Sequence, residues 1–327
     1  MIGSVIALLA AQEALAADSV AARTGRATPI DAFHGRLVWS DWDQGAGAYR
    51  LVALENGAVH VLPVAPRSMP FDVDLGPDRR GRVVAVYSRC RVEGSLGERR
   101  GCDLYEYSFA SGREHVLARV NSRAQEYFPT IWRSRIAFTR GYRATRRGRS
   151  RRLVYWSFLG GHRSARRLRN QNRFGGYPDD LDLRGRRLAT VWSGEFGGAE
   201  ITVGSLNGRP RVISIAPGSG AAAFDYRVFG VSITGATAYW MVTQVGSTPN
   251  FGELRRHAIG STVEEKAMIT LDESTDAFAQ DGAVSNYARP VSGQLCRGQP
   301  VCAESDPHEI HRLDGLSFEP APRLESR

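Results

Sequence analysis

Two pairs of aspartates stand at matching places in the sequence, and their spacing is the pattern best suited to chemistry. Asp72 and Asp74 are separated by one residue, and so are Asp180 and Asp182. Side chains two residues apart on a β-strand point to the same face, so each pair would present two carboxylates together. They could hold a cation or a water molecule, or they could accept hydrogen bonds from the backbone of a neighbouring strand. We favour the second role.

The histidines and the other acidic residues form no recognisable catalytic or metal-binding motif. His308-Glu309-Ile310-His311 is one residue shorter than the H-E-x-x-H motif of zinc proteases, and residues three apart on a strand point to opposite faces. Asp41-Trp42-Asp43-Gln44-Gly45 resembles the start of a calcium loop but lacks its distal glutamate. No G-x-S-x-G sequence is present. We therefore expect no metal and no cofactor, and we assign no catalytic residue.

Arginines are concentrated in one part of the chain. The sequence carries a net charge of +9. Residues 127–178 contain 14 arginines and neither Asp nor Glu, so the remaining residues together are net negative. A GC-rich genome would explain many arginines but not their segregation. The densest group consists of Arg143, Arg146, Arg147, Arg149, Arg151 and Arg152.

This arginine group has two interpretations. Guanidinium groups grip phosphate, sulfate and carboxylate bidentately, and a cluster of them attracts polyanions. The group would then be the contact site for an anionic partner. Alternatively, it is a solvated basic edge, or it faces acidic segments later in the same chain.

The aspartates and arginines belong to a repeated unit, whose clearest copy spans residues 178–216. Four segments of this copy have the length and composition of β-strands, namely residues 178–183, 187–192, 200–206 and 211–216. Asn207-Gly208 between the last two is a strong hairpin signal, because both residues tolerate positive φ. Four antiparallel strands in about forty residues make one propeller blade.

The second strand of this unit recurs six times. Its copies begin at Arg36, Arg82, Arg135, Arg187, Thr237 and Ala283, which are 46 to 53 residues apart. This spacing predicts an all-β fold, a six-bladed β-propeller of four-stranded antiparallel blades. The predicted blades are approximately residues 30–64, 70–120, 128–170, 178–216, 224–270 and 278–324 of a single domain, 28–325.

The order of strands within the blades also predicts how the ring closes. Blade one begins with its inner strand and blade six finishes with its outer strand, so we expect closure without strand exchange. The two aspartate pairs fall on the first strands of blades two and four, which should line the central channel.

One stretch of blade two carries a family resemblance. Residues 74–88 read Asp-Leu-Gly-Pro-Asp-Arg-Arg-Gly-Arg-Val-Val-Ala-Val-Tyr-Ser, and they are followed by Asp103-Leu104-Tyr105-Glu106-Tyr107 and Ser111-Gly112. This resembles the repeat of TolB-type propellers, which are related to WD40-like repeats. The resemblance implies a six-bladed propeller that is exported and used for protein contact. TolB also has an α/β domain before its propeller, and we expect none here.

The N-terminal segment and the cysteines agree with export. Residues 1–17 contain an apolar run followed by Ala14-Leu15-Ala16, which resembles a cleavable signal peptide; the alternative is a short helix packed on the domain. No other run reaches the length of a membrane span. Four cysteines without C-x-x-C spacing favour two local disulfides, Cys90–Cys102 and Cys296–Cys302, over a zinc site.

The sequence therefore predicts a non-catalytic binding propeller in the periplasm, cell envelope or secreted fraction. The long connections between second and third strands all emerge on one face, where binding residues usually gather. The expected partner is a protein or an anionic polymer, and nucleic acid is disfavoured by export. The alternative is a propeller enzyme, such as a lactonase, a lyase or a glycan-active hydrolase, that uses carboxylates at the channel mouth.

Overall fold

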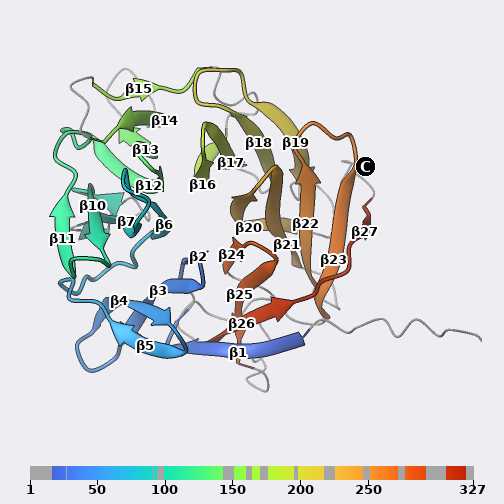
Figure 1. The fold of residues 1–327 in the computed structure, drawn as a ribbon, viewed down its shortest axis with the longest axis horizontal. Helices are drawn as coiled ribbons and strands as arrows, with labels where there is room; N and C mark the ends of the chain where they lie inside the picture. Colours follow the sequence, from blue (N-terminus) through green and yellow to red (C-terminus); the bar gives the residue numbers. More distant parts are fainter. Residues whose placement is uncertain are drawn as a thin grey trace, which may run out of the picture.

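The computed structural model describes residues 17–26, 28–90, 92–93, 99–142, 151–159, 164–169, 176–194, 198–216, 225–245, 251–271, 277–291 and 307–321. Within these ranges every regular secondary-structure element is a β-strand, and the strands form six antiparallel blades around a central axis (Figure 1). The predicted six-bladed β-propeller is confirmed. No helix in the described part of the chain is long and apolar enough to cross a membrane.

The first three blades each follow the chain from the axis outward. Blade one contains β2 (Ile30–Phe33), β3 (Arg36–Asp43), β4 (Ala48–Glu55) and β5 (Ala58–Val61). Blade two contains β6 (Asp74–Pro77), β7 (Val83–Arg89), β10 (Asp103–Ser108) and β11 (Arg113–Val116). Blade three contains β12 (Gln125–Trp132), β13 (Arg135–Tyr142), β14 (Arg151–Phe158) and β15 (Arg166–Arg167).

The last three blades repeat this order. Blade four contains β16 (Tyr177–Arg184), β17 (Arg187–Ser193), β18 (Ala199–Ser205) and β19 (Arg211–Ala216). Blade five contains β20 (Asp225–Thr234), β21 (Thr237–Val245), β22 (Phe251–Ala258) and β23 (Glu264–Leu271). Blade six contains β24 (Ala277–Asp281), β25 (Val284–Pro290) and β26 (His308–Asp314).

Blade six takes its fourth strand from the other end of the chain. β1 (Ala17–Thr24) pairs antiparallel with β26, from Ala17 opposite Asp314 to Thr24 opposite His308. Figure 1 shows β1 lying along β26, while the short C-terminal β27 (Glu319–Pro320) adds a fifth strand beside β23 of blade five. The expected closure without strand exchange is therefore wrong. The ring closes by strand exchange, and its sheets begin at residue 17 rather than 28.

The hairpin turns show where the local sequence decides the geometry. Asn56 and Gly57, between β4 and β5, both have positive φ, at 50° and 78°. Asn207 and Gly208 do not adopt positive φ, although the same dipeptide predicted it. A Cβ on Gly204 would lie 2.6 Å from Cα of Pro210, so proline packs against the end of β18. The connection is a wider turn in which the Gly208 N–H donates to the Ser205 carbonyl at 2.8 Å.

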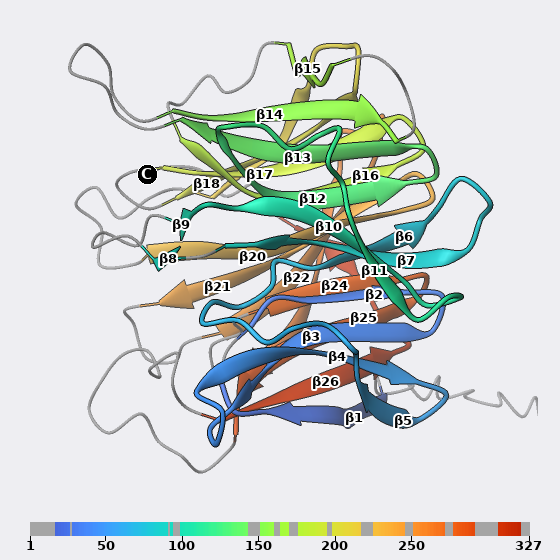
Figure 2. The ribbon, with the colours of Figure 1, turned by 90° about the vertical axis from the view of Figure 1, so that its left-hand side faces the viewer.

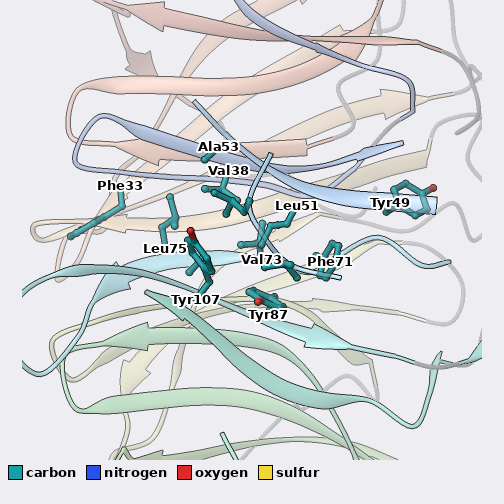
Figure 3. Packing of buried hydrophobic residues seen from close by; sticks show 13 residues of the cluster. Phe33, Val38, Tyr49, Leu51, Ala53, Phe71, Val73, Leu75, Tyr87 and Tyr107 are labelled. Carbon is teal, nitrogen blue, oxygen red and sulfur yellow. The ribbon is translucent and has the colours of Figure 1, made fainter. Parts of the chain in front are cut away.

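The blades are held together by apolar side chains between neighbouring sheets. Figure 3 shows this packing between blades one and two, where Val38 and Leu51 face Phe71 and Tyr87. The rings of Phe71 and Tyr87 meet edge to face, with centroids 5.3 Å apart. Each fully buried side chain of this kind contributes about 1.5–3 kcal/mol through the hydrophobic effect. The core is thus distributed around the ring and leaves the axis to other residues.

Long and short connections lie on opposite sides of the disc. In Figure 2 the hairpin between β6 and β7 lies at the right, and the small ribbon of β8 (Val92–Glu93) and β9 (Arg99–Arg100) lies at the left. This ribbon belongs to the connection between the second and third strands of blade two, which the predicted Cys90–Cys102 disulfide closes. That disulfide is confirmed. Cys296 and Cys302 lie outside the described residues.

Candidate functional site

A cavity of about 780 Å³ opens along the propeller axis on the face that carries the longer connections. All six blades contribute to its wall, through residues that include Asp31, Asp72, Phe128, Asp180, Val231 and Phe278. These residues stand near the beginnings of the inner strands, which the four-stranded blades place around the axis. The cavity has the size of a small-molecule site.

Three of the four predicted aspartates line this cavity, Asp182 does not, and the structure ties each of the four to the next blade. Asp72, Asp74 and Asp180 line the wall. The carboxylate of Asp72 accepts hydrogen bonds from the N–H groups of Ser88 (2.7 Å) and Phe128 (2.6 Å). Asp74 accepts from the N–H of Ile131 at 3.0 Å.

The pair in blade four makes the same kind of contact with blade five. Asp180 accepts a hydrogen bond from the N–H of Val231 at 2.6 Å, and Asp182 accepts from the N–H of Ile233. The backbone-binding role favoured from the sequence is therefore present in both pairs. Four carboxylates, two of them buried (Asp72 and Asp74) and two half-buried (Asp180 and Asp182), thus hold inner strands together.

Three further residues complete a ring of such contacts, and the sequence pattern did not single them out. Asp31 accepts from the N–H of Leu75 at 2.5 Å, Thr130 from Leu183 at 2.8 Å, and Ser232 from Gln280 at 3.2 Å. Together with Asp74 and Asp182, they join each blade to the next from one to six.

A spacing signal could have found this ring. Asp31, Thr130, Asp182 and Ser232 each stand five residues before the first residue of the second strand of their blade. Ala279 holds the same place in blade six, and its side chain has no acceptor. The junction of blades six and one is instead spanned by Asp281, which accepts from the N–H of Gly35 at 2.6 Å.

Burial and mutual repulsion make the axial carboxyls unusually weak acids. Burial raises the pKa of Asp180 to about 7, and that of Asp182 to about 6 although the charge of Arg184 opposes the shift. Burial also raises the pKa of Asp31 and Asp74 well above the usual range, and the charge of Asp182 adds to both shifts. These carboxyls share a small volume with little compensating positive charge.

Aromatic side chains of blade one line one side of the cavity mouth. The guanidinium of Arg26 lies 3.6 Å from the ring centroid of Trp42. Trp42 in turn meets Tyr49 edge to face, with centroids 4.8 Å apart. All three residues line the cavity, so its wall combines carboxylates with flat apolar surfaces.

The arginine group predicted to bind anions is described only at its end. Arg143, Arg146, Arg147 and Arg149 lie outside the described residues. Arg151 and Arg152 begin β14, and a nitrogen of Arg152 lies 4.0 Å from an oxygen of Asp179 on the cavity wall. The guanidinium of Arg152 also lies over the ring of Tyr177, 5.0 Å from its centroid. The described end of this group thus reaches the rim of the cavity.

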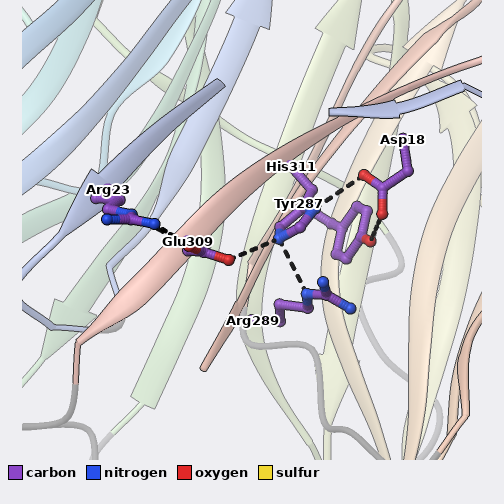
Figure 4. Close-up of polar contacts among 6 residues, drawn as sticks. All are labelled: Asp18, Arg23, Tyr287, Arg289, Glu309 and His311. Carbon is purple, nitrogen blue, oxygen red and sulfur yellow. Dashed lines mark hydrogen bonds and ion pairs between the residues drawn. The ribbon is translucent and has the colours of Figure 1, made fainter. Parts of the chain in front are cut away.

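The His308–His311 motif lies at the seam of the ring, away from the cavity. Figure 4 shows the six residues of this cluster: Asp18, Arg23, Tyr287, Arg289, Glu309 and His311. Nδ1 of the buried His311 lies 2.8 Å from Asp18 of β1, and Arg23 of β1 forms an ion pair with Glu309 at 2.9 Å. No group of three His, Cys, Asp or Glu side chains within the described ranges is arranged to hold a metal. The cluster fastens β1 to blade six.

Comparison with known proteins supports the fold and assigns no family. No family model matches the chain, and no curated protein matches it. Among solved structures, the endosialidase of phage phi92 is similar with a TM-score of 0.54 and 8% identity, over 91% of this chain and 68% of that one.

Two other solved structures resemble the fold of this chain to a similar extent. The lectin of Aleuria aurantia, a six-bladed β-propeller with fucose recognition, has a TM-score of 0.50 and 10% identity over 93% of this chain and 99% of that one. Puromycin hydrolase has a TM-score of 0.50 and 14% identity over 83% of this chain and 51% of that one. This chain therefore spans about half the length of the hydrolase. At such identities the likeness concerns the fold alone.

Proposed function

We propose that this protein is a binding propeller that takes its ligand into the axial cavity on the face with the longer connections. The observation that carries this proposal is the convergence of all six blades on one cavity of about 780 Å³. Its carboxylates are fixed by hydrogen bonds to the backbone, so they present a preformed surface. A preformed site binds without paying for the ordering of its side chains.

The arginine group, whose described end reaches the rim of the cavity at Arg152, extends this proposal to a larger partner. Arg152 reaches Asp179 on the rim, and arginine is the residue that best grips anionic groups. A protein or anionic polymer would then rest its acidic groups on the arginines, outside the carboxylate-lined cavity, and a protein partner could also place another group in the cavity. Export, which the TolB-type resemblance implies, is included in the proposal, and the Cys90–Cys102 disulfide supports it because disulfides persist in oxidising compartments.

One observation favours a second candidate, an enzyme that uses a cavity carboxyl. Asp180 lines the cavity, and burial raises its pKa to about 7. A carboxyl that exchanges its proton near neutral pH has the acidity that general acid–base catalysis requires. In this case the protein would hydrolyse a lactone or a glycoside rather than bind it unchanged.

Equilibrium dialysis distinguishes the two candidates. The protein is incubated with a defined panel of amines, sugars, lactones and short peptides, and both compartments are then analysed by mass spectrometry. Binding predicts that compounds are retained unchanged, whereas catalysis predicts new products.

Two variants localise the effect. Ser68 is exposed at the cavity mouth, and Ser111 is exposed in the β10–β11 turn on the opposite face. Ser68→Trp should abolish retention, and Ser111→Trp should leave it unchanged. If the wild-type protein retains nothing, or if Ser68→Trp retains as much as the wild type, the binding proposal is wrong.

A further inference from the structure

We propose that the axial cavity recognises a positively charged amine, carried by a small organic ammonium compound or by the amino terminus of a peptide. This inference rests on the proposed binding function and names its ligand class. It begins with the charges on the cavity wall. The described lining residues include five carboxylates, Asp31, Asp72, Asp74, Asp179 and Asp180, but only two guanidinium groups, Arg26 and Arg227.

No described arginine is among the groups that shift the pKa of Asp31, Asp74 or Asp180. The guanidinium of Arg26 is stacked on Trp42 at the mouth. The pKa values of Asp31 and Asp74 are raised by burial and then by other aspartates. A cation placed between them would remove this repulsion, because an opposite charge within a few ångströms favours the ionised carboxylate.

The geometry favours an ammonium group over a metal ion. Calcium requires six to eight oxygen ligands at about 2.3–2.6 Å. Here the carboxylates of Asp31, Asp74 and Asp180 already accept backbone hydrogen bonds, and the described His, Cys, Asp and Glu side chains form no group of three suited to a metal. An ammonium group needs only the negative potential and one or two free lone pairs.

The walls suit the apolar part that an amine ligand would carry. Trp42 and Tyr49 line one side of the cavity, and Phe128, Phe229 and Phe278 line others. Cations are attracted to the faces of such rings, and Arg26 already lies over Trp42 in this way. An arylalkyl amine would therefore place its charge among the aspartates and its ring against aromatic side chains.

Isothermal titration calorimetry with three matched probes tests the inference. Phenethylamine is cationic, 2-phenylethanol is neutral and phenylacetate is anionic, while their apolar parts are the same. We expect the amine to bind at least about tenfold more tightly than the alcohol, the ratio that one modest ion pair provides, and phenylacetate to bind least. If the alcohol or the acid binds as tightly as the amine, the inference is wrong and the binding function stands. If no probe or panel compound is retained, the binding function fails as well.

A pair of matched variants places the amine in the cavity. Asp31→Asn removes a charge but keeps an oxygen that can accept from the Leu75 N–H, and it should weaken amine binding about tenfold. Asp314→Asn removes the same charge at an exposed position of β26 and should have no effect. Equal loss in both variants, or in neither, contradicts the inference.

The wild-type protein offers a test that does not depend on the folding of a variant. Phenethylamine stays protonated between pH 7 and pH 5, whereas the cavity-lining Asp180 takes up a proton over this range because its pKa is about 7. Binding should weaken as the pH falls, and binding that is constant or stronger at pH 5 overturns the inference. A short peptide with a free amino terminus and its acetylated form then distinguish a peptide ligand from a small amine.

Discussion

The carboxylate of Asp18 lies 2.8 Å from Nδ1 of His311, although 293 residues separate the two in the chain. His311 is buried, and the ring of Tyr287 stacks on it with centroids 5.2 Å apart. The Tyr287 hydroxyl donates to the same carboxylate at 3.3 Å (Figure 4). Asp18 thus anchors β1 to the sheet of blade six through two side chains.

Replacing this anchor should weaken the closed ring. Asp18→Ala removes the carboxylate that faces Nδ1 of the buried His311 and accepts from the Tyr287 hydroxyl, and such a loss costs about 1–3 kcal/mol. The free energy of unfolding, measured by urea denaturation, should fall by that amount, whereas Asp314→Ala on the same blade should change it by less than about 0.5 kcal/mol. Equal effects of both substitutions would show that the contact contributes nothing specific.

The contact between blades four and five can be tested at Asp182. Asp182→Asn retains an oxygen that accepts the hydrogen bond of the Ile233 N–H, so stability should change little. Asp182→Ala leaves that N–H without its acceptor and should cost about 1–3 kcal/mol. Denaturation midpoints that are the same for the Ala and Asn variants would rule out this role.

The raised pKa of Asp180 makes stability depend on pH. An aspartate in the unfolded chain has a pKa near 3.9, whereas that of Asp180 in the folded protein is about 7. Between these values the folded state binds more protons than the unfolded state. Stability therefore decreases as the pH rises from about 4 to about 7. Asp180→Asn should reduce this decrease between pH 5 and pH 7.5, and an identical slope in both proteins would contradict it.

The two cysteine pairs are tested in different ways, because only the disulfide between Cys90 and Cys102 lies in the described residues. Cys90 and Cys102 close a loop with a sequence separation of 12, so reduction of this disulfide should cost about 2–3 kcal/mol. Cys296 and Cys302 are predicted to form a second local disulfide. Peptide mapping under non-reducing conditions should find them joined to each other, and a peptide that links Cys90 to Cys296 would refute the prediction.

Reversal of charge tests the arginine group. The triple variant Arg146→Glu, Arg147→Glu, Arg149→Glu should lose retention on an anionic matrix at low salt and keep its thermal stability. Wild-type retention should fall with salt, because surface charges are screened beyond about 8 Å at physiological ionic strength. The matched control reverses the exposed Arg79, Arg80 and Arg113. If both variants elute like the wild type, the group is only a solvated basic edge.

The blades could be predicted from the sequence because their signals are local. Each hairpin carries its own turn residues and alternating side chains, and the period repeats six times. The fourth strand of blade six has no such signal. Residues 17–24 are small and mixed in character, and only pairing with β26, nearly 300 residues away, makes them a strand. The local pattern therefore left residues 18–24 outside both the predicted export segment and the predicted blades.

The candidate site was predictable to a similar degree. Asp72 and Asp180 stood out because each has a second aspartate two residues later. Asp31 also accepts a hydrogen bond from the backbone of the next blade, but it has no second aspartate two residues away. Thr130 and Ser232 accept such hydrogen bonds through hydroxyl groups. Their identities differ, so only alignment of the blades could have revealed them. The shared cavity follows from ring geometry, which no single blade encodes.

The position of β1 also sets the order in which the molecule can be completed. β1 is the first of these strands to be synthesised, yet it pairs with β26, up to Asp314. Until residues 308–314 are available, the first strand has no partner and the ring remains open. Unpaired strand edges are templates for association with other chains, and contacts so distant in sequence form slowly. The hazard of aggregation through β1 and β26 is therefore greatest just before residues 308–314 become available, and their pairing lowers it.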